Sequence, residues 1–411
     1  MRSGPRTVLV LVLDAVGLST LEFLLSRRTT PLRLPNLCRL GLANLLSPTA
    51  AEKLGKRRSG ANASRVEQAS ASADSVIGHR EMVGVLDGRT FSLFPDGFSA
   101  EYIRRLEERI GRKTLFNKMA GGMDAIERNA AEHSRTGRPV VYSSKCDPVI
   151  QLAMDEAVIP VPEQHRIADA ALALALEMSV PMTRAIGRAY VRSPEGELVR
   201  TANRHDAVLP LGSKTLVDIL FERDVWTVAV GKTSELVNTR YHEKIKLTSK
   251  AFLDPGLGLR FVHPKAKDTN PFSVQGVVNA LDAARSVFRP KGTFIFANLV
   301  DTDSLYGHTR DVDGALTCLA ETDRILPLIE RRMRRGDLLL ITADHGMLHR
   351  EDYGYHNKEP LFLLAEHVGS RGLGLKPPSG RTLADVGFLT AQMFGLEKEF
   401  VRTASLERFY P

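Results

Sequence analysis

The chain has 411 residues, of which 43% are hydrophobic and 25% are charged, as in ordinary soluble globular proteins. This length allows one large α/β domain with a smaller one, or two ordinary domains. The net charge of +8 comes from scattered basic residues and the aromatic fraction is only 6%, so the composition argues against nucleic acid as a partner and suits a small phosphorylated substrate.

The N-terminal segment predicts a buried strand over residues 8–13 rather than a signal peptide. Its apolar run is broken by Asp14 after about seven residues, and no small-residue cleavage site follows. No other apolar run approaches the ~20 residues that span a bilayer. A disulfide framework is not expected from the three scattered cysteines, Cys38, Cys146 and Cys318. These features predict a cytoplasmic protein that does not bind a membrane.

The next part of the chain predicts a loop and then a separate domain. Residues 51–73 are rich in Ser, Ala and charged residues, and we expect a loop there. Farther along, a charged amphipathic helix is predicted over 99–111, and short strands are predicted over 140–143 and 189–192. We therefore expect an inserted α+β cap domain over residues 91–206 and a core made of residues 1–90 and 207–411.

The core predicts an alternation of strands and helices. Short leucine-rich or β-branched runs indicate buried parallel strands over residues 8–13, 226–230, 293–300, 338–343 and 361–365. Residues 311–335 have apolar positions at helical spacing and stop at Gly336. This alternation predicts an α/β fold with a mostly parallel sheet covered by helices on both faces. Ligands of such sheets bind at the carboxyl ends of the strands.

Candidate metal ligands occur at the predicted strand ends. Asp14 closes the first strand, and His356 lies just before the last one. Two further pairs follow the strands at 293–300 and 338–343, namely Asp303 with His308 and Asp344 with His345. Each residue alone has an ordinary explanation as a turn, cap or surface residue. Together, carboxylates and imidazoles without thiolates suit Mn²⁺, Zn²⁺ or Mg²⁺, and two such ions can clamp a phosphoryl group in transit.

A candidate nucleophile lies in the segment 74–82. Ser75 stands beside small residues at a predicted loop-to-helix transition. A helix N-terminus stabilises phosphate, and a metal can activate a serine hydroxyl. The alternative is that Asp74 and Ser75 simply cap a helix.

Several of these stretches resemble the phosphopentomutase family of the alkaline phosphatase superfamily. Residues 74–84 read Asp-Ser-x-x-Gly-His-x-Glu-Met-x-Gly, similar to the family's nucleophile motif, where Thr usually replaces Ser75. The stretches 303–311, 342–346 and 356–360 resemble its metal-binding motifs. Within the predicted cap, 94–97 and 203–206 also match. The resemblance covers nearly the whole chain in order, and it implies an alkaline-phosphatase-like core with an inserted cap.

The resemblance implies a role for each candidate residue. Asp303, His308 and His356 would hold one metal ion, while Asp14, Asp344 and His345 would hold the other. Ser75 would lie between them as phosphoryl acceptor and metal ligand. The family's ions are typically manganese, and its activator is a sugar bisphosphate. By this resemblance the chain is an isomerase that interconverts ribose 1-phosphate and ribose 5-phosphate, or the deoxyribose forms, through a phosphoserine.

Substrate contacts follow less closely from the resemblance. Asp147, Arg184, Arg188, Arg204 and Lys232 fall in segments where the family contacts its substrate. The loop 143–149 departs from the family pattern, since it carries one extra residue among Ser144, Lys145 and Cys146. Two alternatives therefore remain open. One is a related phosphomutase for another sugar or nucleoside phosphate, and the other is a phosphomonoesterase that uses the same phosphoserine.

Overall fold

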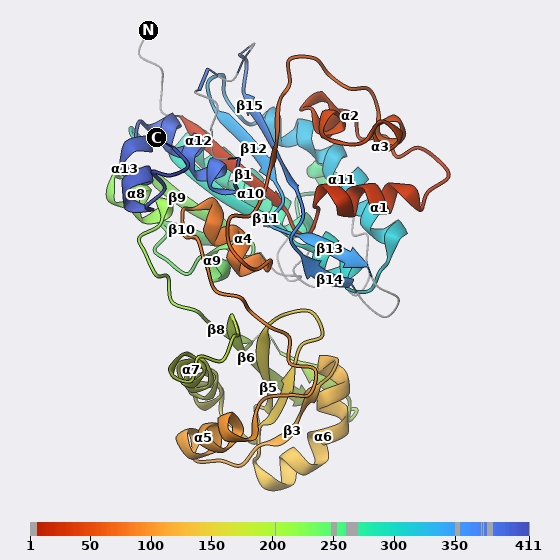
Figure 1. Cartoon of the computed structure of the whole chain (residues 1–411), viewed down its shortest axis with the longest axis vertical. Coiled ribbons are helices and arrows are strands. Elements are labelled where there is room, and N and C mark those ends of the chain that lie inside the picture. The colour runs from red at the N-terminus through yellow and green to blue at the C-terminus, as the bar shows by residue number, and fades with distance from the viewer. Residues whose placement is uncertain are drawn as a thin grey trace. The chain divides into compact units, whose positions relative to one another are not determined.

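The computed structural model describes residues 6–201, 203–247, 253–259, 270–349, 354–370, 372, 374–375 and 381–410. The chain divides into two compact units (Figure 1). One unit, here called the core unit, comprises Met1–Gly88 and Leu211–Pro411, and the other, here called the inserted unit, comprises Arg89–Pro210. Among the residues described, no helix is both long and apolar enough to cross a membrane.

A seven-stranded sheet forms the centre of the core unit. β1 lies between β11 and β12 and is parallel to both, and its residues from Val8 to Leu13 are at most 2% exposed. Such complete burial explains the continuous apolar run, because helices cover both faces of a parallel sheet. In spatial order the strands are β10 (Glu243–Ile245), β9 (Trp226–Val230), β11 (Thr293–Leu299), β1 (Thr7–Leu13), β12 (Leu338–Thr342), β15 (Leu361–His367) and β2 (Asn62–Val66).

Two predictions for this sheet were wrong. The strand predicted as parallel over 361–365 is β15, which pairs antiparallel with β12. β15 therefore starts at the edge of the sheet where the parallel strands end. His356 precedes β15 in the chain, so it lies at this same edge. The stretch 51–73, predicted as a loop, contains β2. The sequence did not predict β2 because this edge strand is polar. It pairs only with β15 in the described sheet and is little buried, so its side chains need not form an apolar pattern.

Helices cover both faces of the core sheet (Figure 1). α12 (Ala384–Phe394) packs on β1 and β12 and contacts α4 (Ser75–Met82), while α10 (Asn270–Ser286) packs on β11 and β9. α11 spans Val312–Glu330, so it ends before the predicted stop at Gly336. The remaining helices of this unit are α1 (Leu18–Ser26), α2 (Pro35–Arg39), α3 (Pro48–Leu54), α8 (Leu216–Glu222), α9 (Thr233–Leu236) and α13 (Glu397–Thr403).

The inserted unit is a second α+β body with its own sheet. Buried clusters include Ile150 and Leu152 in one and Val140 and Tyr190 in the other. The strand order is β3 (Leu115–Met119), β4 (Val140–Ser143), β5 (Val149–Asp155), β6 (Arg184–Arg192) and β7 (Leu198–Arg200), and β8 (His205–Val208) also pairs with β6. The helices are α5 (Ala100–Ile110), α6 (Gly122–Thr136) and α7 (Val161–Glu177).

Candidate metal centre

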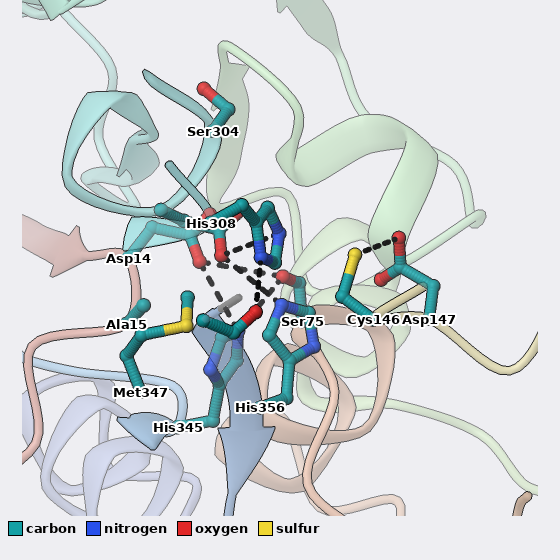
Figure 2. Close-up of polar contacts among 12 residues, drawn as sticks. Asp14, Ala15, Ser75, Cys146, Asp147, Ser304, His308, His345, Met347 and His356 are labelled. Atoms are coloured by element: carbon teal, nitrogen blue, oxygen red, sulfur yellow. Dashed lines mark hydrogen bonds and ion pairs between the residues drawn. The ribbon is translucent and has the colours of Figure 1, made fainter. Parts of the chain in front are cut away.

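Six candidate ligands of the core unit gather in two groups at the edge where the parallel strands end (Figure 2). Within each group, one ligand atom per residue lies within 4.8 Å of the others. The His345 and His356 rings, one from each group, have centroids 4.0 Å apart, so the groups adjoin. The first group is Asp303, His308 and His356, and the second is Asp14, Asp344 and His345.

The first group depends on two irregular elements. Asp303 lies within a π-helical turn, Thr302–Gly307, that directly precedes His308. His356 lies on β14 (Gly354–Asn357), which pairs with β13 (Gly346–His349) in a hairpin that the sequence did not predict. His308 Nδ1 donates a hydrogen bond to the carbonyl of Gly354 at 3.0 Å. This bond turns Nε2 inward, to 3.3 Å from Asp303 Oδ1, and His356 Nε2 lies 3.1 Å from the same oxygen.

The second group is held in the same way. Asp344 Oδ1 accepts hydrogen bonds from the backbone amides of Ala15 and His345, each at 3.1 Å. His345 Nδ1 donates to the carbonyl of Gly346 at 3.0 Å, so Nε2 faces Asp14 Oδ1 at 3.4 Å. Such hydrogen bonds to the outer atoms fix the orientation of metal ligands and the tautomer of a ligating histidine.

The electrostatics of the two groups favour bound cations. Burial, together with repulsion by Asp344 and Asp303, raises the pKa of Asp14 to about 6. Burial lowers the pKa of His345, but the Asp344 and Asp14 carboxylates outweigh it and raise that pKa well above its usual value. The two groups thus contain three buried carboxylates, which need positive charge nearby. The residues therefore fit divalent metal ions with oxygen and imidazole ligands.

Ser75 lies at the start of α4, in contact with the second group. Its Oγ is 3.1 Å from His345 Nε2 and 3.3 Å from Asp14 Oδ1. Asp74 is the N-cap of the helix, and its side chain accepts a hydrogen bond from Val76 N at 2.7 Å. The capping interpretation is therefore correct for Asp74, and it leaves the Ser75 hydroxyl facing the ligands. A Cβ on Gly78 would lie 2.2 Å from the Asp344 carbonyl oxygen, so this glycine permits the close approach of α4.

Four of the five candidate substrate residues lie in the inserted unit. Arg184 donates to Asp147 Oδ1 at 3.2 Å and lies 3.8 Å from Asp206, which Arg204 also contacts. Arg188 donates through Nε to the Gln151 side chain at 2.8 Å. Burial, with repulsion from Arg204 and Arg200, lowers the pKa of the Arg188 guanidinium. The excess of arginine over carboxylate here suits an anionic ligand.

The fifth candidate, Lys232, is in the core unit. It precedes α9, and its charge acts on the buried Asp301 carboxylate. Lys232 therefore belongs to a different unit from the other four candidates.

Three polar residues near the candidate ligands in the fold or in the sequence were not predicted to have a role. His79 and Asn298 lie beside Asp14 and Asp344. Glu359 accepts from the amide of Thr20 at 2.8 Å. His79 and Glu359 stand inside matched motifs, and Asn298 is the one amide in the apolar strand β11. That isolated polar residue in a buried strand was a signal available from the sequence.

The chain is similar to several known proteins. The profile of the Metalloenzyme superfamily matches residues 262–398. A curated phosphopentomutase of Caldanaerobacter subterraneus subsp. tengcongensis is 34% identical over 413 aligned positions, covering 95% of this chain and 94% of that protein. Similar solved structures include a phosphoglycerate mutase of Leishmania mexicana (12% identity, TM-score 0.45, 96% of each chain) and a protein of Pyrococcus horikoshii (14% identity, TM-score 0.43, 96% and 98%).

The full-length relative, together with the matched profile and the buried ligand groups, indicates a metal-dependent phosphomutase, an isomerase of the alkaline phosphatase superfamily that uses divalent metals. The identity over nearly the full length narrows this class further. The chain belongs to the phosphopentomutase family, as its motifs indicated.

Proposed function

We propose that this enzyme interconverts ribose 1-phosphate and ribose 5-phosphate, and their deoxyribose forms, through a phosphoserine at Ser75. The observation that carries the proposal is the Ser75 hydroxyl, which lies 3.1 Å from His345 Nε2 and 3.3 Å from Asp14 Oδ1. The curated phosphopentomutase that is 34% identical to this chain supports the pentose phosphates as substrates. The three buried cysteine thiols support a reducing, cytoplasmic setting.

Two metal ions complete the proposed site. Asp303, His308 and His356 would hold one, and the second group would hold the other, with Ser75 as a shared ligand. Mn²⁺ is proposed for both, on the family resemblance. When bound, such ions lower the pKa of the serine hydroxyl and neutralise charge on the phosphoryl oxygens.

In the proposed reaction Ser75 gives one phosphoryl group to the sugar and receives one from it, so the enzyme ends as it began. Phosphorylated Ser75 gives its phosphoryl group to the C1 hydroxyl of ribose 5-phosphate, which forms a sugar bisphosphate and frees the serine. The phosphoryl group on C5 then returns to Ser75 Oγ, and ribose 1-phosphate leaves. The proton that the C1 hydroxyl gives up is matched by the one that the C5 oxygen takes. A sugar bisphosphate would therefore act as activator by phosphorylating Ser75.

The inserted unit is proposed to bind the sugar phosphate and exclude water, as a cap domain. Its cluster of Arg184, Arg188 and Arg204 supplies positive charge, and Asp147 supplies a carboxylate for sugar hydroxyls. Lys232 is proposed as a further phosphate contact from the core unit. The extra residue of the loop at 143–149 need not disturb this arrangement. Lys145 is exposed, and the pairing of β4 with β5 continues to Ser143 and Ile150.

Phosphorus NMR tests the proposal. The purified protein is incubated with Mn²⁺, a catalytic amount of sugar bisphosphate, and ribose 5-phosphate. We expect ribose 1-phosphate as the main product and little inorganic phosphate, because a substrate enclosed away from water is not hydrolysed. Inorganic phosphate as the main product would instead indicate a phosphomonoesterase.

A loop deletion tests the choice of sugar. Deleting Lys145 restores the family's loop length, so turnover of ribose 5-phosphate should stay unchanged or improve. A wild type that is inert on both pentose phosphates, together with a deletion variant that gains activity, would show that the pocket serves another phosphorylated sugar.

A further inference from the structure

Two buried polar residues connect the nucleophile helix to the candidate ligands of the second group. His79 is fully buried and stands one turn after Ser75 on α4, and Asn298 is 1% exposed near the end of β11. Burial of polar groups in a core is unfavourable unless they are hydrogen-bonded, so their partners carry information.

The hydrogen-bond pattern fixes the tautomer of His79. Its Nδ1 lies 2.8 Å from the carbonyl oxygen of Ser75 and 3.3 Å from Asp344 Oδ2. Both oxygens are acceptors, so Nδ1 carries the proton and donates. In the neutral ring, Nε2 then presents a lone pair and needs a donor.

The orientation of the Asn298 amide follows. Its Nδ2 lies 3.0 Å from His79 Nε2 and 3.0 Å from Asp14 Oδ2. The two hydrogens of one NH₂ group satisfy both acceptors. A flipped amide would set Oδ1 against a carboxylate and a lone pair, so the flip is excluded. Among the residues that the structure describes, Asn298 Oδ1 has no hydrogen-bond partner. The Asn298 side chain therefore contributes its two N–H donors to this cluster.

We propose that His79 and Asn298 are positioning residues that join the backbone of Ser75 to Asp14. The sequence of bonds runs from the Ser75 carbonyl through His79 and Asn298 to Asp14 Oδ2. It leaves Asp14 Oδ1 facing the Ser75 hydroxyl at 3.3 Å. A shift of α4 relative to β1 would break a bond in this series, so the nucleophile and the ligand keep one relative position.

The inference rests on the proposed metal site and nucleophile and assigns two residues that neither metal group includes. Replacing either residue should then lower metal affinity and the catalytic rate together, which the loss of a buried hydrogen bond elsewhere in the sheet would not do. Supporting residues of this kind affect metal affinity by about 10–100-fold. A displacement of about 1 Å at the reacting groups costs about 100-fold in rate.

The experiment compares Asn298→Leu and His79→Phe with the wild type. Leucine keeps the volume at 298, and phenylalanine fits beside Phe296, whose ring centroid lies 5.6 Å from that of His79. Titration of metal-free protein with Mn²⁺ should show dissociation constants raised about 10–100-fold. Turnover should give kcat lowered by about 100-fold, with KM for ribose 5-phosphate changed far less.

Thr227→Val is the matched control. Thr227 is a fully buried polar residue on β9 of the same sheet, and it is also hydrogen-bonded to a histidine, His242. This variant should lose thermal stability and keep its Mn²⁺ affinity. An equal loss of Mn²⁺ affinity in the control would overturn the inference. It would show that removing any buried hydrogen-bonding group from this sheet weakens metal binding.

The double variant tests whether His79 and Asn298 act through one connected series of hydrogen bonds or independently. Because the two residues form one series, Asn298→Leu with His79→Phe should be little worse than either alone. Fold losses that multiply, or single variants that bind Mn²⁺ as the wild type does, would overturn the inference. Should Asn298→Leu fail to fold, His79→Phe tests the series from its other end. A wild type that binds no divalent metal would refute the proposed function instead.

Discussion

Replacing Gly78 by alanine tests whether the approach of α4 to the metal groups sets the reaction rate. A Cβ at this position would lie 2.2 Å from the carbonyl oxygen of Asp344, and carbon and oxygen atoms normally meet at about 3.3 Å or more. The oxygen belongs to the backbone beside the ligands, so it has little freedom to move. The helix must therefore shift by about 1 Å, which carries Ser75 with it.

Two effects of the alanine oppose each other. Alanine favours the helix over glycine by about 1 kcal/mol, whereas forcing a methyl group into a packed core costs about 1–3 kcal/mol. A contact against rigid backbone lies at the upper end of that range, so we expect a net loss of about 1–2 kcal/mol in the free energy of unfolding. The 1 Å shift should lower kcat by about 100-fold.

Denaturant unfolding and steady-state turnover of the Gly78→Ala variant measure the two quantities separately. Gly212→Ala is the control, because a Cβ at Gly212 would have no neighbour within 4 Å. A Gly78→Ala enzyme with the kcat of the wild type would refute the argument that this contact sets the position of the nucleophile.

Three further predictions concern the chemistry and the pH dependence. Ser75→Ala should abolish the phosphorylated peptide and the transfer, and Ser75→Thr should keep partial activity; mass spectrometry and turnover check both, and more than about a tenth of the rate in Ser75→Ala would rule out covalent catalysis. Chelation should abolish activity and Mn²⁺ restore it, while His308→Ala or His356→Ala should lower metal content and slow turnover at least ~10³-fold; undiminished metal content would contradict the assignment. Burial raises the pKa of Asp385 to about 6, so its contribution to stability is complete below about pH 4 and falls by about 3 kcal/mol as pH rises to 6. Unfolding of Asp385→Asn across pH 4–7 should lack this fall, and an unchanged pH profile would contradict the shift.

The sequence predicted the parts of the site that follow regular strands. Asp14 directly follows β1, and Asp344 stands two positions after the end of β12. In both places an apolar run ends in a carboxylate, and the topology of a parallel sheet brings such ends together. His356 was found through its motif, but the β13–β14 hairpin that carries it was not. Its strands are short and only partly buried, and they lack the alternation that marks a hairpin.

Neither the direction of β15 nor the hydrogen bonds of His79 and Asn298 could be predicted from the sequence. A buried strand reads as the same apolar run in either direction, so β15 could not be distinguished from a parallel strand. Hydrogen bonds between residues far apart in the chain depend on the register of strands and the close approach of helices. The single amide in β11 marks a place of interest without naming its partners.

The central position of β1 has a consequence for the nascent chain on the ribosome. Asp14 and Asn298 are 284 positions apart, and Ser75 and His345 are 270 apart. At about 5–20 residues per second, translation needs roughly 15–60 s after β1 emerges before its neighbours β11 and β12 exist. The inserted unit, a contiguous segment, is complete long before then. During that interval β1 has neither of the strands that flank it in the finished sheet, and the two groups of candidate ligands cannot both form until His356 has been made.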